Sequence, residues 1–208
     1  MSKRIQEKGI LAKLLEKGIQ LLIKKECKKI GKININIIAS SIQIIKGIIQ
    51  KIHIIAKDIN YKDLLFDQIE LEANDIEIIY KINNKELKFK NNLMLKIKLS
   101  LSVDSLKKVL LSTKWVWIGE RISKSILNKR KIEDIEIKQD QIIIRILEKN
   151  NLINKEEKVN LKVLQGKLYL ENNNNNFQIP LEDKVYVEEI NIENNLIIIS
   201  AKSPVSFD

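Results

Sequence analysis

The run Ile33-Asn34-Ile35-Asn36-Ile37 alternates apolar and polar side chains without a break, and this period of two predicts a β-strand with one apolar face. Asn194-Asn195 and Gln165-Gly166 lie between later alternating runs, where Asn and Gly tolerate the positive φ of tight hairpins. Asn83-Asn84 has the same kind of position. The expected strands, which we predict to pair mainly antiparallel, cover residues 33–37, 50–56, 68–73, 93–101, 135–147, 159–170 and 185–199.

Two regions have a helical period instead. Leucine and isoleucine recur at spacings near 3.6 between residues 3 and 29, with lysines in between, which predicts an amphipathic helix. The second region runs from residue 103 to 128, with Ser102 as its expected N-cap and a break near Ser112-Thr113. The order of helix, strands, helices and strands predicts an α+β fold.

Trp115 and Trp117 lie in the second helical region. If both belong to one helix they project about 200° apart, so they cannot face the same surroundings. One interpretation buries one indole and leaves the other at a membrane interface, where an amphipathic ring is favoured. The other interpretation packs both rings into the core against different elements.

The composition is that of a globular protein, with 208 residues, 44% hydrophobic and 31% charged. No shift in composition marks a boundary, so we expect a single domain over 1–208, with a basic amphipathic helix in 1–30 and a central helical region in 103–128. One cysteine (Cys27) and one histidine (His53) leave no disulfide and too few soft ligands for a zinc site. No nucleotide-binding, hydrolase or metalloprotease motif is present. We therefore expect no enzyme, no metal and no cofactor.

Positive charge is concentrated in two segments. Residues 1–32 have ten Lys and Arg against three Glu, and residues 81–130 have thirteen against three acidic residues. The segments between and after them are acidic, so the fold either neutralises the basic segments or leaves one positive face for a polyanion. Specific nucleic-acid binding is disfavoured, because only 4 of the 37 basic residues are Arg and aromatic residues are 5%.

A membrane-spanning helix is not expected. The longest stretch without a charged residue, Ile33 to Ile45, is shorter than the roughly 20 apolar residues that a span requires. Charged residues from Glu7 to Lys17 would interrupt the apolar region of a signal peptide. We expect a cytoplasmic protein that binds peripherally to the membrane.

The stretch from His53 to Leu71 ends one strand with Ala-x-x-x-x-Tyr and opens the next with Ile-x-Leu. With residues 99–106, 178–183 and 190–201, it resembles the bacterial LmeA-like phospholipid-binding family, in its cyanobacterial branch. The resemblance covers nearly the whole chain from about Gly9. It departs from the family at Lys62-Asp63, where a glycine is common, and in lacking the anchor or signal of exported members.

The resemblance implies a tubular lipid-binding architecture without catalysis. A curved sheet would wrap around the N-terminal helix and the central helical pair and leave an apolar groove for phospholipid acyl chains. We expect the groove to involve Leu111, Trp115, Trp117, Ile118, Ile122 and Ile126. Docking on an anionic membrane would use Lys13, Lys17, Lys24, Lys28 and Lys124. Two alternatives stay open: an interaction or scaffold module with a fully packed core, and a nonspecific nucleic-acid binder.

Overall fold

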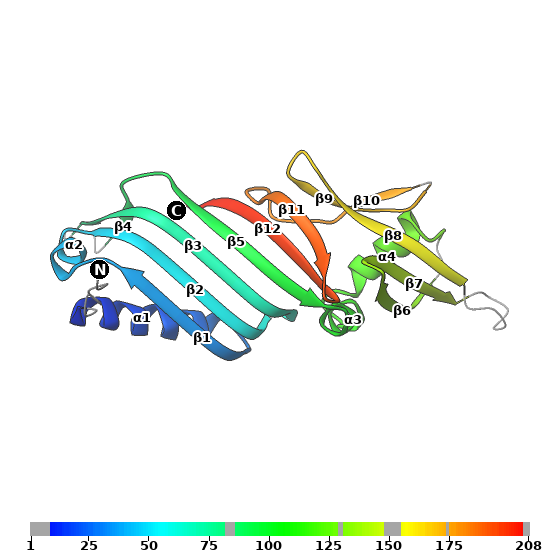
Figure 1. The fold of residues 1–208 in the computed structure, drawn as a ribbon, viewed down its shortest axis with the longest axis horizontal. Helices are drawn as coiled ribbons and strands as arrows, with labels where there is room; N and C mark the ends of the chain where they lie inside the picture. Colours follow the sequence, from blue (N-terminus) through cyan, green and yellow to red (C-terminus); the bar gives the residue numbers. More distant parts are fainter. Residues whose placement is uncertain (1–8, 82–85, 129–130, 148–154, 174, 206–208) are drawn as a thin grey trace, which may run out of the picture.

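The computed structural model describes residues 9–81, 86–128, 131–147, 155–173 and 175–205. Over these residues the chain forms an elongated α+β structure with two antiparallel sheets (Figure 1). The helices are α1 (Ile10–Glu26), α2 (Ser41–Ile45), α3 (Val103–Leu111) and α4 (Val116–Ser125). The α+β class, the N-terminal helix and the central helical pair are confirmed, and the pair breaks at Ser112, where the sequence predicted.

The larger sheet has seven strands in the order β1-β2-β3-β5-β12-β11, with β4 paired to the end of β3. Its strands are β1 (Lys29–Ile38), β2 (Ile48–Tyr61), β3 (Leu64–Lys81), β4 (Glu86–Phe89), β5 (Leu93–Ser102), β11 (Tyr186–Glu193) and β12 (Leu196–Val205). All of its pairs are antiparallel, and the long strands β2 and β3 bow across the molecule (Figure 1). The last hairpin returns to this sheet because β12 pairs with β5 along its whole length.

The second sheet has five strands in the order β10-β9-β8-β7-β6. They are β6 (Lys131–Lys138), β7 (Gln141–Leu147), β8 (Lys155–Leu164), β9 (Lys167–Glu171) and β10 (Asn176–Gln178). The expectation of one sheet is therefore wrong. Each of these strands pairs with its neighbour in the chain, so the segment forms a separate, open sheet. The chain then returns to the larger sheet with β11.

The predicted hairpin turns agree with the structure where it describes them. Asn194 and Asn195 both have positive φ between β11 and β12, and Gln165 and Gly166 do so between β8 and β9. Asn83-Asn84 lies outside the described residues. These turns fix the register of their strands locally, as asparagine and glycine in two-residue hairpins do.

Two strands share a sequence motif, Ala-x-Asp-Ile, that interrupts their alternation. Asp58 in β2 has φ of 54° and Asp75 in β3 has φ of 52°, which is the left-handed region. In each motif the alanine and the isoleucine are buried although they lie three residues apart, as with Ala56 and Ile59. Both strands continue past this point, beyond where strict alternation ended in the sequence. The change of period explains why the predicted strands were too short.

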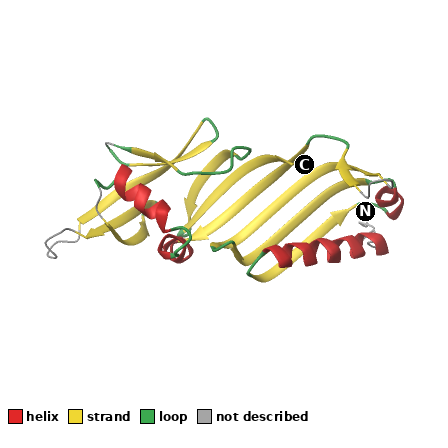
Figure 2. Cartoon of the chain, turned by 180° about the vertical axis from the view of Figure 1, so that it is seen from behind, coloured by secondary structure: helices red, strands yellow, loops and turns green. Residues whose placement is uncertain are grey.

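Two hydrophobic cores hold the structure together. The first lies between α1 and one end of the larger sheet, where Leu15, Ile19 and Ile23 of the helix pack on buried isoleucines of β1 and β2. The second joins the central helices, the second sheet and the far end of the larger sheet. Among the described residues it has twelve buried members, with Ile126 and Ile144 among them. Figure 2 shows α1 at one end of the larger sheet and the central helices at the other, with bare strands between them.

The left-handed backbone conformation of Asp58 allows a prediction about stability. Asp58→Val should destabilise the fold by about 1–2 kcal/mol, because a β-branched residue tolerates positive φ poorly. Asp58→Gly should stay within about 1 kcal/mol of the parent, since glycine adopts this conformation freely. Urea unfolding measures both variants. Equal losses for valine and glycine would mean that the carboxylate, rather than the backbone conformation, is what the position requires.

Candidate functional site

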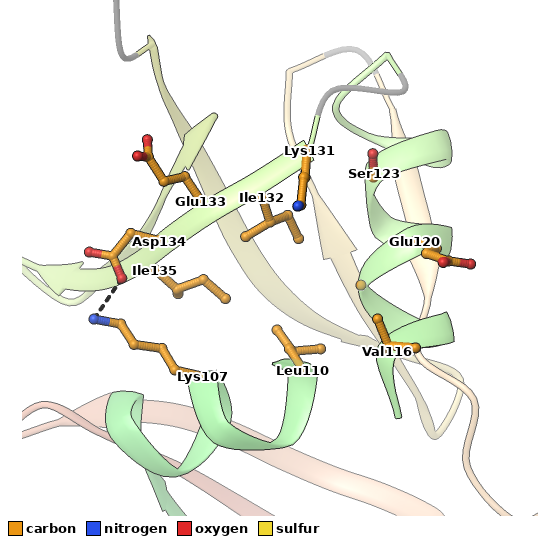
Figure 3. Close-up of a pocket in the computed structure, with 11 residues that line it drawn as sticks. Lys107, Leu110, Val116, Glu120, Ser123, Lys131, Ile132, Glu133, Asp134 and Ile135 are labelled. Atoms are coloured by element: carbon orange, nitrogen blue, oxygen red, sulfur yellow. Dashed lines mark ion pairs between the residues drawn. The ribbon is translucent and has the colours of Figure 1, made fainter. Parts of the chain in front are cut away.

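A half-open cavity of about 320 Å³ lies between α3, α4 and β6. Its apolar wall is formed by Leu110 of α3, Val116 of α4, and Ile132 and Ile135 of β6, whose side chains point toward one another in Figure 3. Gly119 of α4 also lines it, and a Cβ placed there would meet only the Leu110 carbonyl oxygen, 3.9 Å away. The cavity is therefore deepened by the missing side chain of a glycine. Its volume is at the lower end of the range for small-molecule sites, about 300–1,000 Å³.

Charged groups form the rim of the cavity. Lys107 of α3 forms an ion pair with Asp134 of β6, at 2.7 Å between Nζ and Oδ1. Arg145 approaches the other carboxylate oxygen of Asp134 at 3.4 Å. The Lys107 ammonium, together with the Ile135 amide and Arg145, holds the pKa of Asp134 below its ordinary value, against a smaller effect of burial. Lys131, Glu120 and Glu133 complete the rim, so acidic and basic groups are mixed there. The cavity thus offers apolar walls and no strong preference for an anion.

The predicted groove residues lie beside this cavity without lining it. Ile122 and Ile126 are buried in the second core, and Ile118 packs against that core. The cavity is lined instead by the neighbouring face of α4, at Val116, Gly119, Glu120 and Ser123. The side chain of Leu111 lies outside what the structure describes. The elements were expected, but the face of the helix that borders the cavity was not.

The two tryptophans lie together rather than apart. Their ring centroids are 6.3 Å apart at 35°, because Trp115 is the N-cap of α4 and lies outside the helix. The prediction of a 200° separation is therefore wrong. Trp115 donates its indole N–H to the Lys62 carbonyl in the β2–β3 turn, and the Arg121 guanidinium lies 5.1 Å from the centroid of the Trp117 ring. Both indoles remain partly exposed, so together they form a basic and aromatic corner.

Helix α1 has a second apolar stripe that the fold leaves in solvent. Ile10, Leu14, Leu21 and Leu22 are between 59% and 77% exposed. Ile10, Leu14 and Leu21 project within about 40° of one another, on the side away from the packed Ala12 and Ile19. A helix that only packed on the sheet would need one apolar stripe, and this one has two.

Exposed lysines flank that stripe. Lys13, Lys17 and Lys24 lie along α1, and Lys28 follows it and pairs with Asp63 at 2.7 Å. Since Asp63 adjoins Lys62, whose carbonyl accepts from Trp115, the structure brings Lys28 to the same corner as the tryptophans. Lys124 is exposed near the end of α4, apart from the other four. Helix α1, the β2–β3 turn and α3 lie along the same long side of the molecule (Figure 1).

The middle of the larger sheet carries a short apolar strip that belongs to neither core. Ile69 pairs with Leu99, and Leu71 with Ile97, across β3 and β5. All four side chains are only partly buried. They have the same alternation as Ile52 and Ile54 of β2, which pack in the first core. The apolar face therefore continues between the cores where no described helix covers it (Figure 2).

Reactive groups do not gather at this site. Partial burial, and then the charge of Glu26, raise the pKa of the Cys27 thiol, which is opposite to the shift of an activated nucleophile. His53 lies on the other face of the larger sheet, with its Nε2 2.6 Å from a Glu70 carboxylate oxygen. Within the described residues, no three His, Cys, Asp or Glu side chains are close enough to hold a metal ion.

One residue in the sequence indicates the cavity, although it was not among the predicted groove residues. Gly119 stands in the middle of a helical pattern, where glycine costs about 1 kcal/mol relative to alanine. Such a glycine suggests either a close contact or an unfilled space. The open surroundings of its Cα show that it is the second case here.

No helix among the described residues is long and apolar enough to cross a bilayer. No family model, curated protein or solved structure matches this chain. The resemblance to the LmeA-like family therefore stays a prediction, and a functional assignment has to rest on the geometry of the site.

The Lys107–Asp134 pair gives a pH-dependent prediction. Because the pKa of Asp134 is lowered in the folded state, its stabilising contribution is present at neutral pH and is lost as pH falls through the folded-state pKa. Asp134→Asn should lower the free energy of unfolding by up to about 1 kcal/mol near pH 7, since the pair is partly exposed. The difference from the parent should shrink below about pH 4. Urea unfolding across this range measures it, and a difference independent of pH would contradict the assignment.

Proposed function

We propose that this protein is a non-enzymatic lipid-binding protein that docks on an anionic membrane surface and takes a lipid acyl chain into the cavity between α3, α4 and β6. The observation that carries the proposal is the half-open apolar cavity itself, with its Leu110, Ile132 and Ile135 wall. Its mixed rim suits a neutral hydrocarbon tail better than a charged headgroup. The selection of anionic lipid then falls to the lysines outside it.

The size of the cavity indicates whether the protein could carry a whole lipid through water or hold only part of one acyl chain. Each methylene removed from water contributes about 0.8 kcal/mol, so a tail of about 16 methylenes that left the bilayer would need about 13 kcal/mol of shelter. A site at the lower limit of ligand volumes, about 300 Å³, encloses part of one chain. The proposed lipid therefore stays at the membrane while its tail is bound, and the protein stays with it.

Docking follows from the exposed side of α1. A helix that presents apolar residues between lysines lies in the interface plane of an anionic bilayer. Each engaged lysine contributes roughly 1 kcal/mol there. Lys13, Lys17 and Lys24 together would give about 3 kcal/mol, which supports reversible and salt-sensitive binding. The partly exposed Trp115 and Trp117 suit the headgroup region at the other end of this side.

Charge reversal tests the docking surface. Lys17→Glu with Lys24→Glu should weaken binding to vesicles of phosphatidylglycerol and phosphatidylcholine by at least about tenfold, because two attractive charges become repulsive. Cosedimentation at low and high salt measures the change. Lys158→Glu with Lys162→Glu, on β8, is the matched control and should bind as the parent does.

Binding that survives the α1 reversals unchanged would exclude docking through α1. A parent protein that binds no vesicle at all would exclude the membrane proposal as a whole. If the protein instead binds random DNA more tightly than vesicles, with an affinity that falls steeply as salt rises, the nucleic-acid alternative is favoured.

Filling the cavity tests the acyl-chain site. Gly119→Leu places its Cβ in open space on the cavity side of α4, and leucine favours a helix by about 1 kcal/mol over glycine. This variant should be as stable as the parent or more so, yet lose at least about tenfold in affinity for a fluorescent long-chain fatty acid.

The control for this experiment is Gly18→Leu, because Gly18 of α1 also has open space around it and lies outside the cavity. It should keep the affinity of the parent for the fatty acid. If Gly119→Leu binds the fatty acid as well as Gly18→Leu does, the cavity is not the site. If neither variant nor the parent binds it, the scaffold alternative with a packed core is favoured.

A further inference from the structure

Five exposed isoleucines gather at the end of the molecule where α2 lies, far from the cavity. Ile42 and Ile45 of α2 are 67% and 76% exposed, and Ile10 at the start of α1 is 77% exposed. Ile38 at the end of β1 and Ile48 at the start of β2 are also exposed, on the face of the sheet opposite to the buried Ile37 and Ile49. Figures 1 and 2 both show α2 at this extremity, beside the N-terminal end of α1 and the ends of β1 and β2. We call Ile10, Ile42 and Ile45 the isoleucine tip.

The short helix at the tip is held firmly although it buries none of its side chains. Ser40 and Gln43 form a capping box, in which the Ser40 hydroxyl accepts from the Gln43 amide and the Gln43 side chain accepts from the Ser40 amide. Gly47 closes the other end with φ of 74°. A Cβ at Gly47 would lie 2.1 Å from the Ile78 carbonyl oxygen, so only glycine fits against β3.

The tip is also fixed to α1. Gly9 packs so closely on Ser41 that a Cβ there would lie 2.7 Å from the serine hydroxyl. The isoleucines of α2 and Ile10 are therefore presented together, on a rigid support. A fixed, solvent-exposed apolar group of this kind marks a binding surface, because it contributes nothing to the core.

The charges around the tip favour an anionic bilayer as its occupant. Lys46 ends α2, Lys13 and Lys17 lie in the first turns of α1, and all three are exposed. Glu77 of β3 is paired with Lys90 at 2.8 Å, and Glu16 faces the sheet, where it accepts from the Ile37 amide. Asp75 is the exposed carboxylate on the adjoining part of β3. The described surroundings of the isoleucines thus have an excess of lysine, as in interfacial anchors.

We infer that the isoleucine tip inserts into the boundary between headgroups and acyl chains of an anionic bilayer, while α1 lies along the surface beside it. This inference rests on the proposed membrane docking. The tip contributes what the lysines cannot: binding that persists in high salt and a fixed orientation of the molecule. The elements that border the cavity, α3, α4 and β6, lie in the other half of the long axis, so the insertion point and the acyl-chain site are separate (Figure 1).

Loss of the isoleucines tests the insertion. Ile42→Ser with Ile45→Ser should reduce partition onto phosphatidylglycerol-containing vesicles by at least about tenfold and abolish the part that remains at about 1 M salt, where exposed charges are screened. Both side chains are exposed, so the fold should melt as the parent does. Leu164→Ser with Leu181→Ser, two exposed leucines elsewhere, is the matched control and should bind normally.

A fluorophore gives the depth directly. In a Cys27→Ser background, an environment-sensitive dye at Ile45→Cys should shift to the blue on vesicles and be quenched by lipids brominated in their acyl chains. The same dye at Lys138→Cys, in the exposed β6–β7 hairpin, should stay in water.

The outcomes separate the two proposals. If the protein binds vesicles while the dye at position 45 remains in water, or if the serine variant binds as tightly as the parent, the tip does not insert and docking through α1 stands. If the parent binds no vesicles, docking fails, and insertion fails with it. If ultracentrifugation finds a dimer that the serine substitutions dissociate, the tip is a self-association surface and the bilayer assignment is overturned.

Discussion

The structure depends on burying one long apolar face of the larger sheet. The described helices and the second sheet cover only the two ends of that face. The larger sheet presents isoleucine and leucine along the whole of one face, and burial of that face is the main favourable contribution to folding. Helix α1 covers one end, and the second sheet with α3 and α4 covers the other. Because α1 (Ile10–Glu26) spans only about 25 Å at 1.5 Å per residue, it cannot reach the second core. The partly exposed Ile69, Leu71, Ile97 and Leu99 are the direct result.

The sequence predicted local structure well and long-range arrangement poorly. Alternation at Ile33–Ile37 and the asparagine turn at Asn194-Asn195 were sufficient to place strands and hairpins, because both are properties of neighbouring residues. Alternation says which side of a strand is apolar, but not which strand pairs with it. The division into two sheets depends on β12 pairing with β5, some 100 residues earlier in the chain.

The candidate site shows the same limit. The break near Ser112 was predicted, but not the angle at which α4 leaves it, and that angle decides that Val116 and Gly119 border the cavity while Ile122 is buried. Helix α2 was not predicted because five residues are too few to show a helical period. Its capping box, Ser40 with Gln43, was the available signal.

The segregation of charge along the chain has a structural explanation. Acidic residues of β3 pair across the sheet with lysines of β2 and β5, as where Glu72 meets Lys51 at 2.5 Å and Lys96 at 3.8 Å. The hydrogen bonds from Lys51 and then Asn74 lower the pKa of Glu72 to about 2. Lys90 and Lys96 of the second basic segment are thus paired with acidic residues of β3. Lys13, Lys17 and Lys24 of α1 remain exposed on the outside of the molecule.

One carboxylate on α1 has a wider effect than its single hydrogen bond suggests. Within the described strands, β1 pairs on one side only, with β2, so its other side is a row of backbone groups that another chain can extend. Glu16 occupies one of these groups by accepting from the Ile37 amide at 2.8 Å. The side chain stands where the next strand of a growing fibril would form its ladder. Through this hydrogen bond, α1 covers part of the open edge of β1, the kind of edge along which amyloid-like ladders grow.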